Sequence, residues 1–138
     1  MRIVALGLGL AIMGAGAVSV AVAAAPSPLP PPPPSGASLP KGQCVLTHEL
    51  GNHVVVDQDT LLLDGFGRSK GVYRVTMKNG CLRSAVSSDP LAIRQVGGGR
   101  LCAPRDVEIR ARSGFCAIDS IVKLSPDEVA ALPRRLRP

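Results

Sequence analysis

The chain has 138 residues, with 16 lysines and arginines against 10 aspartates and glutamates, which gives a formal net charge of +6. Its length allows one domain. It contains one tyrosine, two phenylalanines and no tryptophan, so the sequence predicts an aliphatic core and lacks the aromatic platforms on which single-stranded nucleic acid stacks. Nucleic acid is therefore not expected as a partner.

The first 23 residues have the three-part layout of a secretory signal peptide. Arg2 supplies positive charge, residues 3–22 contain no charged side chain, and small residues follow. Signal peptidase selects small residues before its cut site, so we predict a signal peptide over residues 1–23. The alternative is an uncleaved membrane anchor, since about 20 apolar residues can cross a bilayer. Both predict an exported protein, periplasmic or secreted, with a membrane as partner only if the segment stays uncleaved.

Residues 24–43 form a proline-rich segment with five consecutive prolines at positions 30–34. Proline has no amide hydrogen to donate, and a run of prolines settles into an extended polyproline II helix. We predict a disordered linker over this range. The alternative is a stand-off spacer or a ligand for a proline-binding partner.

Residues 44–132 consist of short apolar runs separated by turn residues. Predicted strands cover residues 44–50, 53–56, 60–63, 72–77, 91–94, 107–110 and 118–124. Alternation places Tyr73, Val75 and Met77 on one face. Gly51-Asn52 is predicted to close a two-residue hairpin, and Asn79-Gly80 to form a tight turn. Many short strands at close spacing predict a mainly β fold, a small antiparallel barrel or sandwich.

One short helix is predicted over residues 125–132, at the C-terminal end of the domain. Ser125 is a suitable N-cap, and Glu128 completes a capping box three residues later. Two turns of helix are not stable alone in water, so we expect the apolar side of this helix to pack on the sheet. Residues 133–138 follow as a basic tail.

All four cysteines lie in the predicted β domain, at Cys44, Cys81, Cys102 and Cys116. In an exported domain of this size they predict two disulfides rather than free thiols. No CxxC pair is present, which argues against a zinc ribbon or a thioredoxin-type centre. Three connectivities are possible. Because the outer cysteines mark the ends of the strand-rich region, we expect Cys44 to pair with Cys116, and Cys81 with Cys102.

His48 and His53 are the nearest approach to a catalytic metal motif. The HExxH motif of metalloproteases places two histidines four residues apart on one helical face. Here they are five residues apart, and Gly51-Asn52 would break a helix. We therefore expect surface histidines, with no catalytic residue, no metal site and no cofactor. A metal-dependent or hydrolytic enzyme that uses these two histidines is the alternative.

Five arginines fall in one third of the domain: Arg94, Arg100, Arg105, Arg110 and Arg112. Such a cluster can hold an anionic partner by electrostatic attraction and counterion release. Asp106, Glu108 and Asp119 dilute its positive charge. We predict a candidate anion surface here, and the alternative is a solvated basic face.

The motifs of the domain follow a particular order: Cys44, Val-Asp-x-x-Thr-Leu at residues 56–61, Tyr73-Arg74, Cys81, Leu101-Cys102 with Asp106-Val107, Cys116 and the capped terminal helix. This order resembles a domain-of-unknown-function family, number 6491, of small exported proteobacterial proteins with four cysteines. The resemblance implies export, two disulfides and a β-rich domain, and it brings no known activity, cofactor or catalytic residue. The sequence therefore predicts an exported, non-catalytic domain that binds an envelope component or a partner protein.

Overall fold

The computed structural model describes residues 29–138, so the predicted signal peptide lies outside the described residues. Within residues 29–138 the chain forms nine strands, one α-helix and four short 3-10 helices. The strands are β1 (Val45–Leu46), β2 (Leu50–Val55), β3 (Thr60–Gly65), β4 (Gly71–Met77), β5 (Ala92–Gln95), β6 (Arg100–Leu101), β7 (Val107–Ala111), β8 (Gly114–Cys116) and β9 (Ile118–Lys123). The helices are α1 (Pro126–Ala131), η1 (Thr47–Glu49), η2 (Gly67–Ser69), η3 (Pro104–Asp106) and η4 (Arg134–Leu136).

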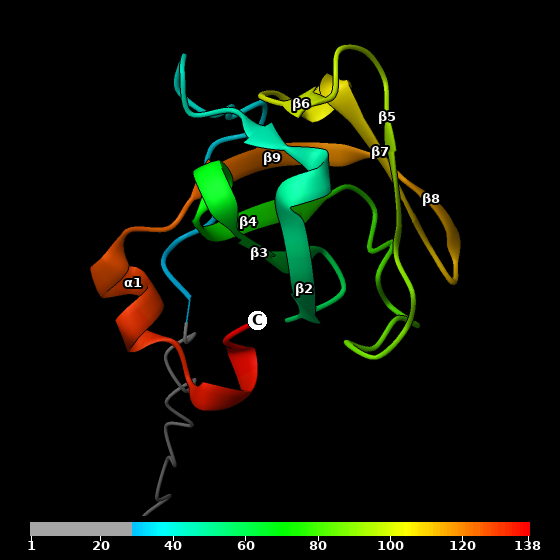
Figure 1. Ribbon diagram of the computed structural model, residues 1–138. Helices are drawn as coiled ribbons and strands as arrows, with labels where there is room; N and C mark the ends of the chain where they lie inside the picture. The colour runs from blue at the N-terminus through cyan, green and yellow to red at the C-terminus, as the bar shows by residue number, and fades with distance from the viewer. Residues whose placement is uncertain (1–28) are drawn as a thin grey trace, which may run out of the picture.

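The strands pair into three antiparallel sheets, which confirms the mainly β fold (Figure 1). A four-stranded sheet with the order β2-β3-β4-β9 lies at the centre of the molecule. A three-stranded sheet, β5-β7-β8, lies on one side of it, and the pair β1-β6 lies at one end. The arrangement is a sandwich, and the strands of residues 29–138 do not close into a barrel.

The first core fills the space between the two larger sheets. Tyr73, Val75 and Met77 of β4 point into it, as the alternation of the sequence predicts. Ile109 of β7 and Cys116 of β8 enter from the other sheet. Apart from one tyrosine, this core is built from aliphatic and sulfur-containing side chains, and burying each large one stabilises the fold by about 1.5–3 kcal/mol. The tyrosine hydroxyl donates to the carbonyl of Ser69 at 2.8 Å.

A second core lies on the opposite face of the central sheet. Leu62 of β3 and Val72 of β4 are buried there against Leu132 and Leu136 from the C-terminal part of the chain and Leu29 from the N-terminal part. Figure 1 shows α1 and the last residues on the side of the central sheet away from β5-β7-β8. The domain is therefore layered, with one core on each face of its central sheet.

The C-terminal helix forms with the predicted cap. The Ser125 hydroxyl accepts a hydrogen bond from the Glu128 amide at 3.2 Å, and the Glu128 carboxylate accepts one from the Ser125 amide at 2.7 Å. The residues predicted as a basic tail continue into η4, where Leu136 is buried. Arg137 donates to the carbonyls of Ala130 at 2.8 Å and Leu132 at 3.0 Å. A cation at a helix C-terminus satisfies carbonyls that have no partner within the helix, so the tail is part of the folded domain.

The prediction of a disordered proline linker is wrong for the part that the structure describes. Residues 29–39, which we call the proline strap, lie against the domain, with Leu29 and Leu39 buried. Arg74 of β4 donates from its Nη1 atom to the carbonyls of Pro30 at 2.7 Å and Pro31 at 3.2 Å. A proline residue has a carbonyl acceptor but no amide donor. The buried Arg74 guanidinium supplies the donors for two of these carbonyls.

The far end of the proline strap pairs with the backbone of β9. The Gly36 amide donates to the carbonyl of Asp119 at 3.0 Å, and the Ile121 amide donates to the carbonyl of Ala37 at 2.9 Å. These bonds satisfy backbone groups at the edge of the central sheet, which would otherwise stay unpaired. The strap was not predicted because its anchors, Arg74 and β9, are distant in sequence.

The predicted hairpin at Gly51-Asn52 does not form. Both residues lie inside β2, where the pairing with β3 shifts between Leu50 and His53 as a β-bulge. A two-residue hairpin turn of the tight kind requires positive φ angles, and neither residue has one. The turn predicted at Asn79-Gly80 does have them, with φ of 63° and 62°.

The disulfides are Cys44–Cys102 and Cys81–Cys116, so the prediction of two bridges is confirmed but the nested pairing is wrong. Pairing of β1 with β6 sets Val45 opposite Leu101, which brings the neighbouring Cys44 and Cys102 to a Cα–Cα distance of 4.5 Å. Cys81 and Cys116 have a Cα–Cα distance of 5.6 Å. The bridges interleave along the chain because strand pairing, and not position along the sequence, decides which cysteines meet.

Candidate anion-binding face

The five arginines of the predicted anion surface do not gather in one place. Arg94 lies on β5, Arg110 on β7, and Arg112 in the turn between β7 and β8. Arg100 lines a separate hollow of about 230 Å³ with Arg68 and Cys44, and Arg105 lines another of about 270 Å³ with Lys78 and Asp119. Three of the five therefore remain as one candidate site on the sheet β5-β7-β8.

The outer face of this sheet carries two of these arginines and an aromatic ring. Ile93, Ile109 and Cys116 point into the first core, so the residues between them point outward. Arg110 of the middle strand β7 pairs with Phe115 of β8 on one side and with Ala92 of β5 on the other. The three side chains therefore lie in a row on the outward face. We call the surface made by Ala92, Arg94, Arg110, Arg112 and Phe115 the arginine face.

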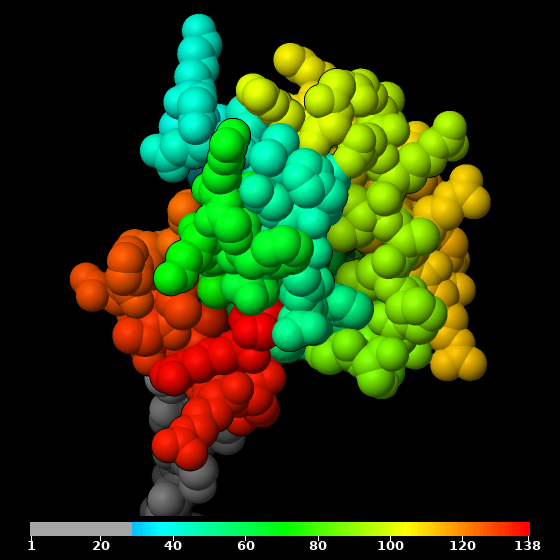
Figure 2. Space-filling view, in the orientation of Figure 1, coloured from blue at the N-terminus to red at the C-terminus, as the bar shows by residue number. Residues whose placement is uncertain are grey.

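The arginine face is exposed. Phe115 keeps 58% of its surface accessible, and the Arg94 side chain keeps 73%. Figure 2 shows the segments that form this sheet on the side of the molecule away from α1 and the C-terminal residues. Residues 29–138 leave more than half of Phe115 uncovered, although a large aromatic side chain is normally buried where the chain can bury it.

The electrostatics of the arginine face are weakly compensated. Arg94 approaches the Glu108 carboxylate at 4.0 Å, at the limit of an ion pair. Within residues 29–138 the other ion pair joins Lys78 to Asp119, so neither Arg110 nor Arg112 is paired with a carboxylate. Guanidinium groups without protein partners are free to form bidentate bonds with an incoming carboxylate.

A cleft of about 520 Å³ adjoins the arginine face. It is lined by Asp89, Pro90, Leu91, Ala92, Arg110, Ala111 and Arg112. The cleft therefore combines apolar walls with two arginines and one aspartate. Sequence reasoning identified its arginines but missed Phe115, and the signal for it was the alternation of β8, which sends Phe115 outward and Cys116 inward.

The two histidines are placed in different elements. His48 is exposed in η1, and His53 lies on β2 opposite Leu63, half-buried, with no hydrogen-bond partner for its Nε2 atom among the described residues. Within residues 29–138, no three His, Cys, Asp or Glu side chains come together in a group that could hold a metal ion. Asp57 and Asp59 act as turn caps, accepting hydrogen bonds from the amides of Asp59 and Gly80 respectively.

Fold and surface define this chain as a disulfide-bonded β-sandwich with an exposed arginine face. No family model matches the chain, and no curated protein or solved structure shows a significant similarity to it. The resemblance seen in its motifs therefore stays a prediction. Among residues 29–138, no helix has the length and apolar character needed to cross a bilayer. Two disulfides are typical of an oxidising, non-cytoplasmic environment.

Proposed function

We propose that the protein is an exported, non-catalytic domain that binds an acidic segment of a partner protein on its arginine face. The observation that carries this proposal is the cross-strand pair of Arg110 and Phe115, both exposed on the outer face of β5-β7-β8. Arginine and aromatic residues are the side chains most enriched at the centres of protein interfaces. Arg94 and Arg112 extend the same surface.

The scaffold under this surface is anchored by the first core and by a disulfide. The inward side chains of the same strands belong to the first core, and the Cys81–Cys116 bridge ties β8 to the chain segment that follows β4. Rigid presentation lowers the conformational entropy lost on binding. A domain of this kind acts by covering the surface of the partner that it binds, and this requires no catalytic group.

Charge complementarity selects an acidic partner segment. The unpaired guanidinium groups of Arg110 and Arg112 attract carboxylates, and the apolar walls of the adjoining cleft accept an aliphatic or aromatic side chain between them. Such an interface weakens as salt screens the charges.

The experiment is a titration of the exported protein with a short fluorescent peptide of alternating acidic and aromatic residues, at low and at high salt. We expect binding that weakens with salt, and an Arg94→Glu, Arg110→Glu double variant that binds at least about tenfold more weakly, a change of 1.4 kcal/mol. A Lys41→Glu, Arg83→Glu variant is the matched control, because it changes the net charge equally at exposed positions elsewhere.

Two outcomes would contradict the proposal. Equal loss in the control variant would mean that net charge alone attracts the peptide. Retention on peptidoglycan or on anionic vesicles, lost in the Arg94→Glu, Arg110→Glu variant while the peptide does not bind, would replace the partner protein with an envelope component.

A further inference from the structure

A hollow separate from the arginine face lies beside the Cys44–Cys102 bridge, at the end of the molecule that carries β1 and β6 (Figure 1). Its volume is about 230 Å³, and we call it the disulfide hollow. It is lined by Gly42, Cys44, Leu46, Arg68, Ser69 and Arg100. The set contains one half of a disulfide and two arginines, and it contains no carboxylate.

Strand register places the bridge and Arg100 on the same face of the β1-β6 pair. Val45 and Leu101 lie opposite each other, and both are buried in the first core. Because successive side chains point to opposite faces of a strand, the residues that flank this pair point away from the core. The Cys44–Cys102 bridge on one side of the pair and Arg100 on the other therefore share the outward face.

The second arginine of the disulfide hollow comes from another element. Arg68 belongs to η2, and the Leu46 amide of β1 donates to the Ser69 hydroxyl of η2 at 3.0 Å. This bond fixes η2 beside β1. Arg68 and Arg100 therefore approach the same hollow from η2 and from β6, and both are exposed.

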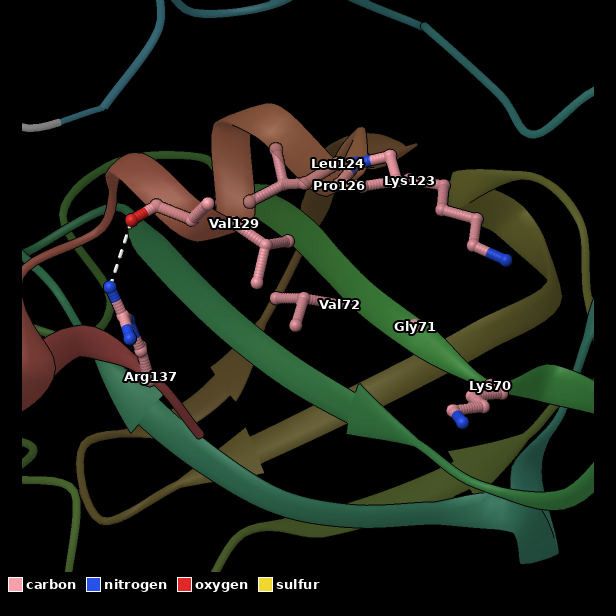
Figure 3. A pocket seen from close by; sticks show the side chains of 9 residues that line it. Lys70, Gly71, Val72, Lys123, Leu124, Pro126, Val129 and Arg137 are labelled. Carbon is pink, nitrogen blue, oxygen red and sulfur yellow. Dashed lines mark hydrogen bonds between the residues drawn. The ribbon is translucent and has the colours of Figure 1, made fainter.

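Both arginines of the disulfide hollow lack a partner of opposite charge. Among residues 29–138 the ion pairs lie elsewhere, and the Glu49 carboxylate, which accepts a hydrogen bond from the Ser69 amide at 2.8 Å, does not line the hollow. The groove between β4, β9 and α1 differs, because its Arg137 already donates to the Ala130 carbonyl (Figure 3). The two guanidinium groups of the disulfide hollow are therefore free to hold an incoming carboxylate.

The two disulfides differ in how they are buried. Cys116 is 1% exposed and belongs to the first core, against which its partner Cys81 also packs. Cys44 and Cys102 are both half-buried and belong to neither core. A disulfide exchanges only where a thiolate can reach one of its sulfur atoms. Since Cys44 lines a surface hollow, its bridge is the one that is open to exchange.

We propose that Cys44 is a site of mixed-disulfide formation with a small thiol that carries a carboxylate. Arg68 and Arg100 hold the carboxylate, and the thiolate sulfur attacks the Sγ atom of Cys44. The Cys44–Cys102 bond breaks as the new sulfur–sulfur bond forms, and Cys102 leaves as a thiolate that takes a proton from water. One disulfide replaces another, so the step needs no oxidant. Neighbouring cations also favour the thiolate forms on which exchange depends.

The test compares thiols of different charge on the oxidised protein. Mercaptopropionate, mercaptoethanol and cysteamine carry a negative, a neutral and a positive group on short chains. Each is added in limiting amount, new protein thiols are trapped with iodoacetamide, and peptide mapping locates the mixed disulfide. We expect mercaptopropionate on Cys44 and the trapped thiol on Cys102, with Cys81 and Cys116 still bridged.

Variants separate the charge effect from the intrinsic reactivity of each thiol. Arg68→Glu with Arg100→Glu should slow mercaptopropionate at least about tenfold, affect mercaptoethanol less and speed cysteamine. Arg68→Gln with Arg100→Gln adds no new charge and should give the same order with smaller changes. Arg134→Glu with Arg135→Glu is the matched control, because it changes the net charge equally at exposed positions of η4, and it should leave all three rates unchanged.

The proposal is overturned if the mixed disulfide forms on Cys102 or at the Cys81–Cys116 bridge, or if no mixed disulfide forms. It is also overturned if both arginine variants, with the fold kept by circular dichroism, slow all three thiols equally, because the arginines would then act on the cysteines and not on the carboxylate of the thiol. An equal loss in the control variant would contradict it as well, since net charge alone would then attract the thiol.

Discussion

The two faces of the central sheet are stabilised in different ways. The first core, toward β5-β7-β8, is closed by strands from the middle of the chain and is bordered by the Cys81–Cys116 bridge. The second core is closed by the two ends of the described chain, by Leu29 of the proline strap and by Leu132 and Leu136 near the C-terminus, whereas Leu39 of the strap is buried in the first core. Terminal segments of this kind can detach from the sheet without unfolding it. We therefore expect the same type of mutation to change the free energy of unfolding differently on the two faces.

The disulfides stabilise the first face by lowering the conformational entropy of the unfolded chain. The bridged cysteines are 58 and 35 residues apart in sequence, and on the chain-entropy model such loops correspond to ~4.2 and ~3.8 kcal/mol of stabilisation. Contributions of this size approach the whole stability of a small domain. The second face has no such bridge among residues 29–138, and it depends on packing and hydrogen bonds.

Arg74 is the polar centre of the second face. Only 5% of its surface is accessible, and burial lowers the pKa of its guanidinium, while Asp57 and Glu128 act against this shift. Its Nη1 atom holds two proline carbonyls, whereas its Nε atom has no partner among the described residues. A buried cation without a carboxylate in contact carries a desolvation cost that its hydrogen bonds offset only in part. The second face is therefore the less stable one.

The largest predicted difference between the faces comes from two neighbouring leucines of β3. Leu63 faces the first core and Leu62 the second, and both are fully buried. We expect Leu63→Ala to lower the free energy of unfolding by about 4 kcal/mol and Leu62→Ala by about 2–3 kcal/mol, since the terminal segments can collapse into the cavity. Chemical denaturation of both variants measures this. A larger loss for Leu62→Ala would contradict the comparison.

A smaller effect is predicted for Arg74→Met, which keeps the apolar stem and removes the donors to the proline strap. We expect a change of about 1–2 kcal/mol in global stability and faster hydrogen exchange at the Ile121 amide, which bonds the strap at Ala37. Exchange in the first core should stay unchanged. Arg83→Met is the control, because Arg83 is exposed. Unaltered exchange at Ile121 would show that Arg74 does not hold the strap.

The smallest effect is predicted for the pH dependence of the helix cap. Hydrogen bonds from Ser125 lower the pKa of Glu128 below its ordinary value of 4.5, with nearby Arg74 adding to the shift. A carboxyl with a lowered pKa stabilises the fold above pH 4.5 and loses this contribution as the pH falls through its folded pKa. Glu128→Gln should therefore cost about 0.5 kcal/mol at neutral pH and nothing in strong acid.

Melting temperatures across this pH range measure the effect of Glu128→Gln. Asp127→Asn is the matched control, because Asp127 lies in the same turn but outside the capping box. The same pH dependence in both variants would mean that the helix dipole, and not the capping bond, is responsible.

Several elements could be predicted because the residues that determine them are neighbours in the sequence. A short apolar run located β3, alternation located β4, β5, β7 and β9, and Ser125 with Glu128 located the helix start. The inward face of β4 was likewise predicted correctly. The bulge in β2 was mistaken for a turn because Gly-Asn suits both, and only pairing with β3 keeps this strand continuous.

The sites were less predictable than the elements. The arginines were found because five of them lie in one third of the domain sequence. In the structure they lie on separate surfaces, and strand register sets Phe115 beside Arg110. The groove between β4, β9 and α1 could not be predicted either, because Val72, Leu124 and Val129, which line it, belong to distant segments that only the second core brings together.

The sequence by itself determined a mainly β domain with two disulfides, an aliphatic core and a capped terminal helix. Periodicity and capping motifs act over a few residues, and the cysteine number and the aliphatic core follow from composition. Tertiary structure decided which cysteines pair, where the proline strap lies and which cations share a surface. Those outcomes depend on contacts between residues such as Arg74 and Pro30, 44 positions apart, and such contacts form only once strand pairing has brought distant segments together.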